Sequence, residues 1–473
     1  MHFILLLFGV IFVYLQILIW CNIFMKRKIY NELLKWKNDW NGKTAVLIDG
    51  ARRVGKSYIV EEFARNEYKS YILIDFSKED KQLKMLFEEY LGDLDTFFRM
   101  LSLLKDVHLY PRESVIVFDE VQQYPPARAA IKHLVKDGRF DYIETGSLVS
   151  INRNVKNIVI PSEEDRIDMY PMDFEEFLWA LGKDEMMGYI RECFSARKPL
   201  GASLHRKAME LFRQYIIVGG MPQAVDTYVN EKDFNRVDHI KRNILKIYRA
   251  DISKYAAGSE QKVTRVFDTI PSQLQRHEKR FHVGDLGKGT RTRDYANAFF
   301  WLEESRVVNV CYAATEPNVG LYLNRDDAKR KLYMADTGLL IAMAFREKDI
   351  EQGQLYKKLM FDKLEVNKGM LVENIVAQML RTAGNDLYFY SSPSPVTEDR
   401  MEIDFLVRKP SVTSRHNISP IEVKSSSHYA LASLEKCIRK YREYLSTPYV
   451  IHSGDYTEKD GITYLPLYMT ICL

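Results

Sequence analysis

Residues 50–57 read Gly-Ala-Arg-Arg-Val-Gly-Lys-Ser, which fits the G-x-x-x-x-G-K-[ST] pattern of a phosphate-binding loop. The two glycines let the backbone turn tightly, so that successive N–H groups point toward anionic oxygens. Lys56 can reach the β- and γ-phosphates of a nucleotide, and the Ser57 hydroxyl can bind Mg²⁺. We therefore expect a nucleotide site lined by Gly50, Ala51, Arg52, Arg53, Val54, Gly55, Lys56, Ser57 and Tyr58.

The residues on either side of this loop have the patterns of a strand and a helix. Residues 44–48 are apolar or β-branched, which predicts a buried strand. Within residues 58–68, the apolar side chains of Ile59, Phe63 and Ala64 share one helical face. A helix that begins directly after the loop adds its dipole to the loop's N–H groups. This context supports the phosphate-binding interpretation.

A second acidic group follows another buried strand. Residues 114–118 predict a buried parallel strand, and Asp119 and Glu120 come directly after its apolar residues. Ligands of open α/β sheets bind at the carboxyl ends of the strands. We expect Asp119 to coordinate Mg²⁺, directly or through water, and Glu120 to orient or deprotonate the attacking water.

The first half of the chain alternates between strand and helix patterns. Further strands are predicted at 71–75, 140–143 and 166–170, and helices at 58–68, 79–91, 93–105 and 126–137 separate the earlier ones. This alternation predicts an α/β fold with a doubly wound parallel sheet.

Three more polar residues lie near the predicted strand ends. Thr145 and Ser147 could sense the γ-phosphate or position water, although Thr-Gly-Ser is also an ordinary turn sequence. Arg166 is the best candidate for an arginine that stabilises charge on the γ-phosphoryl group. The alternative for Arg166 is a surface ion pair.

Composition adds few constraints. Hydrophobic residues are 46% of the chain and charged residues 28%, and the net charge of +4 favours no class of partner. The five cysteines are scattered without a C-x-x-C pair, so we expect neither a zinc site nor a disulfide framework, and a cytoplasmic location is the default.

The first 24 residues have a different character. Residues 3–25 contain no charged side chain and are long enough to span a bilayer core. Lys26, Arg27 and Lys28 follow at once and would hold the rest of the chain in the cytoplasm. Two interpretations compete: a membrane anchor, or an over-extended start whose true beginning is Met25. We favour the start at Met25.

Several motifs resemble those of prokaryotic P-loop ATPases of the AAA superfamily that carry a C-terminal domain of unknown function. These motifs are the loop at 50–57, Val-Phe-Asp-Glu-Val-Gln at 117–122, Glu-Thr-Gly-Ser at 144–147, Tyr-Pro-Met-Asp-Phe-Glu-Glu-Phe at 170–177, Val-Gly-Gly-Met-Pro-Gln-Ala at 218–224 and Asp-Thr-Gly-Leu at 336–339. The resemblance covers nearly the whole chain from Met25. It departs at Ala51 and Arg53, where the family usually has Pro and Gln. The resemblance implies ATP binding and hydrolysis with Mg²⁺, in an ATPase domain at 25–185 followed by a helical lid at 186–258.

Residues 259–345 predict a winged helix. A helix at 263–274 and another that opens at 290–295 precede two strands, at 307–312 and 331–334. Basic residues at the second helix and between the strands could contact DNA, or could be solvated in a protein-docking module. These residues are Arg291, Arg293, Arg325, Lys329, Arg330 and Lys331. Within the lid, Arg249 and Asp251 could face nucleotide or a neighbouring subunit, but we expect a solvated helix end there.

The C-terminal segment, 346–473, contains three carboxylates that could converge on a divalent cation. Glu373 lies on a predicted helix at 369–381, Asp404 on a strand at 401–407, and Glu422 on a strand at 421–424 that also carries Lys424. This order resembles the PD-(D/E)XK nucleases, with Mg²⁺ or Mn²⁺ as the expected metal and Lys424 beside the scissile phosphate. The alternative is a degenerate domain used for binding.

The leading hypothesis is a Mg²⁺-dependent ATPase coupled to a DNA- or protein-interacting C-terminal module. The alternatives are an ATP-gated metal-dependent nuclease and a nucleotide switch that does not hydrolyse. A membrane partner follows only if residues 1–24 are real, and the oligomeric state is not predicted.

Overall fold

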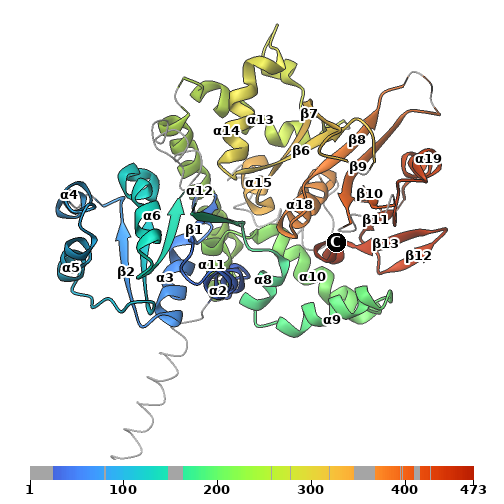
Figure 1. The fold of residues 1–473 in the computed structure, drawn as a ribbon. Helices are drawn as coiled ribbons and strands as arrows, with labels where there is room; N and C mark the ends of the chain where they lie inside the picture. Colours follow the sequence, from blue (N-terminus) through green and yellow to red (C-terminus); the bar gives the residue numbers. More distant parts are fainter. Residues whose placement is uncertain are drawn as a thin grey trace, which may run out of the picture.

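The computed structural model describes residues 25–78, 81–146, 163–256, 258–276, 278–318, 320–345, 368–394, 396, 398–409, 416–426 and 428–473. Residues 1–24 and Ser147 therefore lie outside the described part of the chain. Within that part, no helix combines the length and the apolar character needed to cross a bilayer. The chain forms two sheets, one near each end of the molecule, with helices packed between them (Figure 1).

The first sheet has five parallel strands in the order β2-β3-β4-β1-β5. The α/β fold with a parallel sheet is thereby confirmed. Because β1 and β3 both flank β4, their carboxyl ends lie close together, and these ends carry the phosphate loop and the two predicted acids. The strands are β1 (Ala45–Gly50), β2 (Ser70–Asp75), β3 (Ser114–Asp119), β4 (Asp141–Gly146) and β5 (Glu164–Met169).

Helices cover both faces of this sheet, which gives three layers (Figure 1). Apolar side chains of α4, α5 and α6 form one buried cluster on one face, and those of α2 and α3 belong to a second cluster on the other. The second cluster continues without a break into the helices and strands of the C-terminal half. These helices are α2 (Ile29–Trp40), α3 (Lys56–Glu67), α4 (Lys81–Glu89), α5 (Leu94–Lys105) and α6 (Pro125–Asp137), with a short 3-10 turn, η1 (Val121–Gln123), before α6.

A helical segment follows β5, where the sequence predicts a lid. Its longest member, α12, runs along the nucleotide domain and also packs on α11, α13 and α15. The helices are α8 (Phe174–Ala180), α9 (Asp184–Ser195), α10 (Ala202–Val218), α11 (Pro222–Glu231), α12 (Phe234–Tyr255) and α13 (Glu260–Leu274).

The second sheet has eight strands in the order β12-β13-β11-β10-β9-β8-β6-β7. The predicted wing strands are present as the antiparallel pair β6 and β7, but β6 also pairs in parallel with β8. The segments we predicted as a winged helix and a nuclease-like domain therefore share one sheet, and the division at residue 345 stays a prediction. The strands are β6 (Val308–Ala314), β7 (Arg325–Met334), β8 (Tyr388–Ser392), β9 (Met401–Arg408), β10 (Ile418–Val423), β11 (Tyr449–His452), β12 (Thr457–Lys459) and β13 (Ile462–Pro466).

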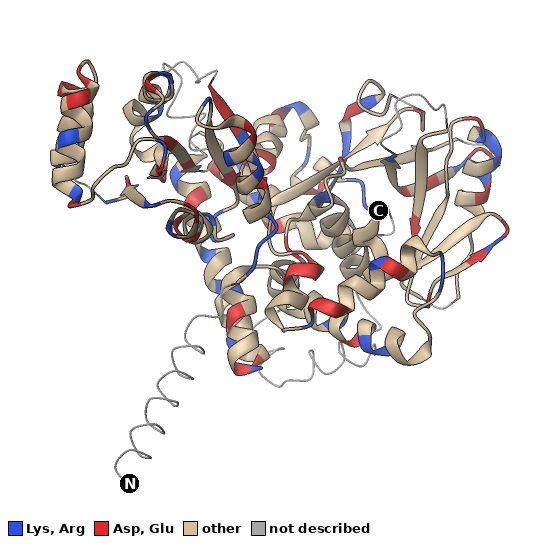
Figure 2. Cartoon of the chain, turned by 60° about the horizontal axis from the view of Figure 1, so that its bottom comes forward, with Lys and Arg blue, Asp and Glu red and all other residues tan. Residues whose placement is uncertain are grey.

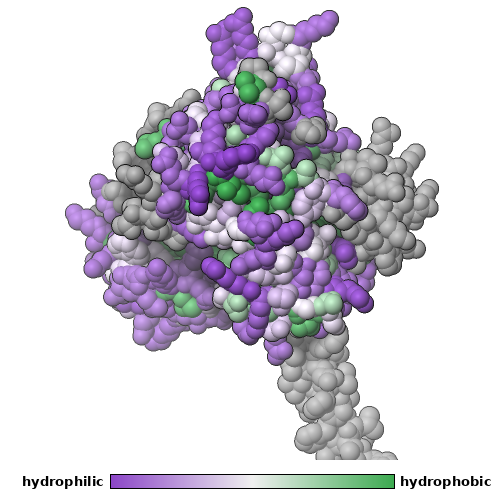
Figure 3. Space-filling model, turned by 90° about the vertical axis from the view of Figure 1, so that its right-hand side faces the viewer, coloured by the Kyte–Doolittle hydropathy of each residue, from purple (hydrophilic) through white to green (hydrophobic). Residues whose placement is uncertain are grey.

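Helices and 3-10 turns complete the C-terminal half around this sheet. Seen from the side of the C-terminal strands, the surface is mostly hydrophilic with one apolar area near its centre (Figure 3). The elements are η2 (Val283–Leu286), η3 (Thr292–Tyr295), α14 (Ala296–Glu304), α15 (Thr337–Ala344), α18 (Lys368–Thr382), α19 (Ala432–Tyr441) and η4 (Leu467–Cys472).

Two glycine-containing motifs, at 218–224 and 336–339, hold the helical segment after β5 against the second half of the chain. Asp336 begins α15 by accepting a hydrogen bond from Leu339 N at 2.8 Å, and its other oxygen accepts one from Gly220 N. Gly338 packs so closely on the end of α10 that a Cβ atom there would lie 2.5 Å from the carbonyl oxygen of Val218. Both motifs therefore have a structural reason for their glycines.

The Gly338→Ala variant tests this junction. We expect it to lower the free energy of unfolding by about 1–3 kcal/mol, because the added methyl group meets backbone that cannot move aside. Gly188→Ala on α9 is the control, since its Cβ atom would have no neighbour within 4 Å, and we expect no loss there. Urea unfolding followed by circular dichroism measures both, and equal stability of the two variants would contradict the close packing.

Candidate functional site

The phosphate loop connects the end of β1 to the start of α3. Gly50 is required by close packing, because a Cβ atom there would lie 2.3 Å from the carbonyl oxygen of Met169 on β5. Gly55 has a φ of +97° and directly precedes α3, a conformation that favours glycine. The remaining loop residues differ in exposure: Ala51 and Val54 are buried, Arg52 and Arg53 are exposed, and Tyr58 on α3 is half exposed.

Lys56 lies in the mouth of the loop and is buried. Its ammonium group donates hydrogen bonds to the carbonyl oxygens of Gly50 at 2.8 Å and Ala51 at 3.1 Å. Burial lowers the pKa of Lys56, against the opposing effect of nearby carboxylates that include Glu120. The loop thus holds a cation at the position where the pattern predicts phosphate binding.

Three predicted site residues converge beside Lys56. Ser57 Oγ donates a hydrogen bond to Asp119 Oδ1 at 2.8 Å, and Thr145 Oγ1 donates to the same oxygen. A hydroxyl and a carboxylate are hard oxygen ligands, so Ser57 and Asp119 fit the requirements of Mg²⁺. The three residues come from three adjacent elements, α3, β3 and β4, which brings the predicted strand ends together.

Glu120 follows Asp119 in a left-handed backbone conformation with a φ of 53°. Its N–H donates to Thr145 Oγ1 at 3.2 Å, and its Oε2 accepts a hydrogen bond from Gln122 Nε2 at 2.6 Å. Gln122 therefore orients the carboxylate that we expect to act on water. Sequence reasoning did not single out Gln122, although its position two residues after Glu120 was a usable signal.

A buried arginine, Arg27, contacts the backbone of the phosphate loop. Arg27 donates hydrogen bonds to the carbonyl oxygens of Val54 at 2.8 Å and Tyr170 at 2.7 Å. Its Nε atom donates to Glu176 Oε1 at 3.0 Å, and both side chains are almost fully buried. The sequence indicated for Arg27 only a positive charge that follows the apolar N-terminal segment, because nothing in its local sequence indicates a contact with the loop.

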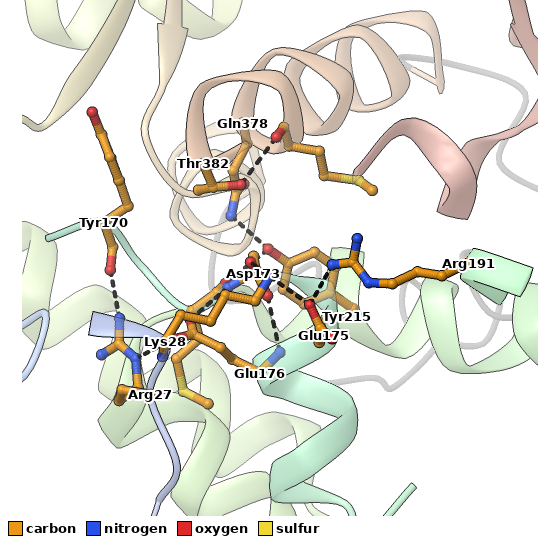
Figure 4. Close-up of polar contacts among 12 residues, drawn as sticks. Arg27, Lys28, Tyr170, Asp173, Glu175, Glu176, Arg191, Tyr215, Gln378 and Thr382 are labelled. Carbon is orange, nitrogen blue, oxygen red and sulfur yellow. Dashed lines mark hydrogen bonds and ion pairs between the residues drawn. The ribbon is translucent and has the colours of Figure 1, made fainter. Parts of the chain in front are cut away.

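The same polar cluster reaches the C-terminal half of the chain (Figure 4). Asp173 and Glu176 form a capping box at the start of α8. The carbonyl oxygen of Met172 accepts a hydrogen bond from Tyr215 OH at 2.8 Å, and Gln378 Nε2 on α18 donates to Tyr215 OH at 2.9 Å. The Tyr-Pro-Met-Asp-Phe-Glu-Glu-Phe motif therefore joins the phosphate loop to the second sheet's helices.

Arg166 lies on β5 and is engaged by carboxylates. Its Nη2 atom lies 2.6 Å from Asp49 Oδ2, and its Nε atom lies 3.3 Å from Asp168 Oδ1. Arg306, which follows α14, contacts the same two carboxylates. Burial alone would lower the pKa of Arg306, but Asp168 and Asp49 raise it. These contacts favour the ion-pair alternative for Arg166, and its catalytic role stays a prediction.

The end of α12 faces the phosphate loop, which differs from the solvated helix end that we expected. Asp251 Oδ1 lies 2.5 Å from Arg52 Nη1, and Tyr248 OH donates to the carbonyl oxygen of Arg52 at 3.1 Å. Arg249 points elsewhere and forms an exposed ion pair with Asp268 at 2.9 Å. Only tertiary packing decides which side of α12 meets the loop, so local sequence could not reveal this contact.

Two of the three carboxylates of the predicted second metal site, those of Glu373 and Asp404, lie beside an ammonium group, together with the carboxylate of Glu402. Lys331 Nζ is buried and lies 3.0 Å from Glu402, 3.4 Å from Glu373 and 3.8 Å from Asp404. Lys279 also contacts Glu373. Burial alone would raise the pKa of Glu373, but Lys331 and Lys279 lower it to about 2.

The remaining members of that predicted site lie beside this cluster. Glu422 pairs with Lys424 at 2.7 Å, and burial together with Asp404 raises the pKa of Glu422 to about 7. Within the described ranges, no three His, Cys, Asp or Glu side chains are arranged to hold a metal ion. The predicted second metal site therefore stays a prediction that these contacts do not support, because Lys331 lies beside Glu373 and Asp404 and Lys424 lies beside Glu422.

Several basic side chains predicted to contact DNA lie beside acidic ones, and acidic and basic segments alternate over the described chain (Figure 2). Arg330 packs over the Phe299 ring at 4.5 Å. DNA contact therefore stays a prediction. Ion pairs with neighbouring acidic residues weaken it, because they partly neutralise the basic side chains. The pairs are Arg325 with Asp327 at 2.5 Å, Lys329 with Asp326 at 3.2 Å, and Arg293 with Asp294 at 3.8 Å.

Comparison with protein families identifies the segment that holds the phosphate loop. Residues 42–178 match the family model described as an AAA domain. These residues are an AAA domain. Residues 209–350 and 368–469 match two families described as domains of unknown function, DUF8612 and DUF4143. The resemblance to P-loop ATPases of the AAA superfamily with a C-terminal domain of unknown function is thereby confirmed.

Solved structures similar to the chain include one named as an ATPase and two with other names. The Walker-type ATPase PABY2304 of Pyrococcus abyssi is 15% identical, with 68% of this chain and 96% of that chain covered and a TM-score of 0.38. Cdc6p from Pyrobaculum aerophilum is 10% identical over 72% and 94%, with a TM-score of 0.24. The Aeropyrum pernix ORC1 protein in complex with DNA is 12% identical over 66% and 88%, with a TM-score of 0.25. TM-scores this low carry no inference about the chain. Comparison with curated protein sequences gives no match.

The Arg27→Met variant tests the support behind the AAA domain's phosphate loop. We expect a loss of about 3–5 kcal/mol in the free energy of unfolding, because Glu176 would remain buried without its cationic partner. Lys26→Met is the control, since Lys26 forms an exposed pair with Asp184 and should cost at most about 1 kcal/mol. Urea unfolding measures both. Similar losses in the two variants would contradict the role of Arg27.

The Lys331→Met variant tests the carboxylate cluster. We expect a loss of about 3–5 kcal/mol at pH 7, which the added change Glu373→Gln should partly restore. Because the pKa of Glu373 is lowered on folding, its contribution is full above its unfolded pKa of about 4.3 and is lost as the pH falls toward 2. The wild-type advantage over Lys331→Met should therefore shrink as the pH falls from about 4.3 toward about 2, the range that these two pKa values define.

Lys440→Met is the matched control for this comparison, because Lys440 and Asp399 form an exposed pair. Its loss should stay below about 1 kcal/mol. Urea unfolding followed by circular dichroism measures each variant across the pH range. A Lys331→Met variant as stable as this control would show that the ammonium group does not stabilise the cluster.

Proposed function

We propose that the chain is a Mg²⁺-dependent ATPase whose chemistry takes place in the AAA domain. The observation that carries this proposal is the convergence of the Ser57 and Thr145 hydroxyls on one oxygen of Asp119, whose charge acts on Lys56. A hydroxyl, a carboxylate and an ammonium group at the end of a phosphate-binding loop are what a nucleoside triphosphate with its metal requires.

Each residue has one role in this proposal. Lys56 exchanges the carbonyl oxygens of Gly50 and Ala51 for phosphate oxygens when a nucleotide enters the loop. Glu120, oriented by Gln122, accepts the proton of the attacking water.

Ser57 and Asp119 are the residues that would hold Mg²⁺, and Thr145 keeps Asp119 oriented. When bound, the ion would neutralise part of the negative charge of the nucleotide's phosphates. Burial of the site strengthens each of these electrostatic interactions. The wider location of the protein and the identity of a DNA or protein partner stay predictions.

The contacts of the C-terminal carboxylates do not support the nuclease alternative. Two of the carboxylates on which it depends, Glu373 and Asp404, lie beside Lys331, and that arrangement supports a role in joining β7, α18 and β9 within the C-terminal half. The alternative of a nucleotide switch without hydrolysis is one outcome of the experiment below.

Turnover of ATP by purified protein with Mg²⁺ tests the proposal. We expect Lys56→Ala to abolish hydrolysis, because the loop loses its phosphate-binding cation. Glu120→Gln should keep ATP bound but slow turnover by about a hundredfold or more, since it cannot accept the proton of water.

Lys69→Ala and Glu113→Gln provide matched controls, because these two residues form an exposed ion pair in the same domain. Both should turn over ATP at the wild-type rate. Wild-type turnover in Lys56→Ala would contradict the proposal. ATP binding without turnover in the wild-type protein would favour the switch.

A further inference from the structure

A cleft separates the AAA domain from the middle of the chain on the side where the γ-phosphate of a bound nucleotide would lie. Arg52, Lys56 and Glu120 line one side of this cleft. Tyr248 and Asp251 of α12 line the other side, together with Trp301 of α14. Residues of α12 and α14 therefore cover the side of the phosphate loop that faces this cleft.

Arg52 is held in this cleft by α12. Its guanidinium lies 2.5 Å from Asp251, and its carbonyl oxygen accepts the hydrogen bond from Tyr248. Half of the Arg52 side chain remains exposed, whereas Asp251 is largely covered. The anion beside Arg52 in this conformation is thus a carboxylate supplied by a different part of the chain.

Arg52 is better placed for γ-phosphate contact than Arg166 or Arg306. Those two arginines share Asp49 and Asp168, and neither lines the cleft with Lys56 and Glu120. The Arg52 guanidinium has a single carboxylate partner among the described side chains, and that partner lies across an interface between elements. Exchange of this partner for a phosphate breaks no contact within the AAA domain.

Trp301 gives a second, independent indication of a ligand in the cleft. Its Nε1–H is buried and has no hydrogen-bond acceptor among the described residues. A buried donor without an acceptor costs about 1–3 kcal/mol, so its presence on the wall of a cleft favours an acceptor-bearing ligand there. Phosphate oxygens are such acceptors.

We propose that Arg52 is the arginine that stabilises charge on the γ-phosphoryl group, and that Asp251 holds Arg52 until a γ-phosphate replaces it. This inference rests on the proposed ATPase function. A guanidinium is always charged and can donate two parallel hydrogen bonds to a phosphate. The γ-phosphate carries more negative charge than one carboxylate, so it competes with Asp251 for the same cation. Binding of ATP then breaks the ion pair between α12 and the phosphate loop, and binding of ADP does not.

Kinetics and nucleotide affinity of Arg52→Ala test the first half of the proposal. We expect kcat to fall by about a hundredfold or more, as loss of an arginine that acts on the γ-phosphoryl group does. The affinity for ATPγS relative to ADP should fall by about tenfold, because only ATPγS carries a γ-phosphate. Arg249→Ala is the matched control on α12, since Arg249 pairs with Asp268 at the surface, and neither quantity should change in it.

The Asp251→Asn variant tests the second half. Removing the competing carboxylate should raise the affinity for ATPγS severalfold and leave the affinity for ADP unchanged. If Arg52 served only to fasten α12, then Arg52→Ala and Asp251→Asn would both lower the melting temperature and shift both affinities in the same direction. That parallel result would overturn the proposal.

The outcomes separate this inference from the ATPase proposal. Wild-type turnover together with unchanged kcat and unchanged ATPγS preference in Arg52→Ala would overturn the inference alone. No turnover in the wild-type protein, together with a lost ATPγS preference in Arg52→Ala, would overturn hydrolysis and support the γ-phosphate contact. No turnover and no change in preference would overturn both.

Discussion

The hydrogen bond from the buried Arg27 guanidinium to the carbonyl oxygen of Val54 is the contact on which the rest of the structure depends. The same guanidinium engages Glu176, so the phosphate loop and the start of α8 are held by one cation. From there, hydrogen bonds through Tyr215 reach Gln378 on α18. A charge buried this deeply must keep its partners. The phosphate loop is therefore held by Arg27, and the C-terminal half is connected to the same arginine through this network of hydrogen bonds.

The side of the phosphate loop that faces the cleft is held by an exposed ion pair instead of a buried one. The pair between Arg52 and Asp251 lies at the edge of a cleft and, with the hydrogen bond from Tyr248 to the Arg52 carbonyl oxygen, joins the phosphate loop to α12. A permanent support on one side and an exchangeable ion pair on the other let a γ-phosphate change the position of α12 without unfolding the loop. Helix α12 packs on α15, which packs on α18, so α12 is also in contact with the helices of the C-terminal half.

Much of the nucleotide domain could be predicted from the sequence, because its signals are local. The loop pattern, the apolar strands and the acidic pair after β3 depend on residues that are close in the chain. The roles of Arg27, Asp251 and Lys331 could not be predicted in this way. Each depends on a partner far away in sequence, and a lone charged residue has the same local pattern whether it is solvated or buried. The C-terminal half shows the limit most clearly: the order of three carboxylates suggested a metal site, but a lysine from β7 lies beside two of them and Lys424 pairs with the third.

The central claim is that the γ-phosphate changes the contact between the phosphate loop and the end of α12. Hydrogen–deuterium exchange of residues 245–255 in the full chain, compared between ADP and ATPγS with Mg²⁺, tests it most directly. We predict faster exchange in these residues with ATPγS than with ADP, because Asp251 loses Arg52 only when a γ-phosphate is present. Identical exchange with the two nucleotides, at concentrations that saturate the site, would contradict the account.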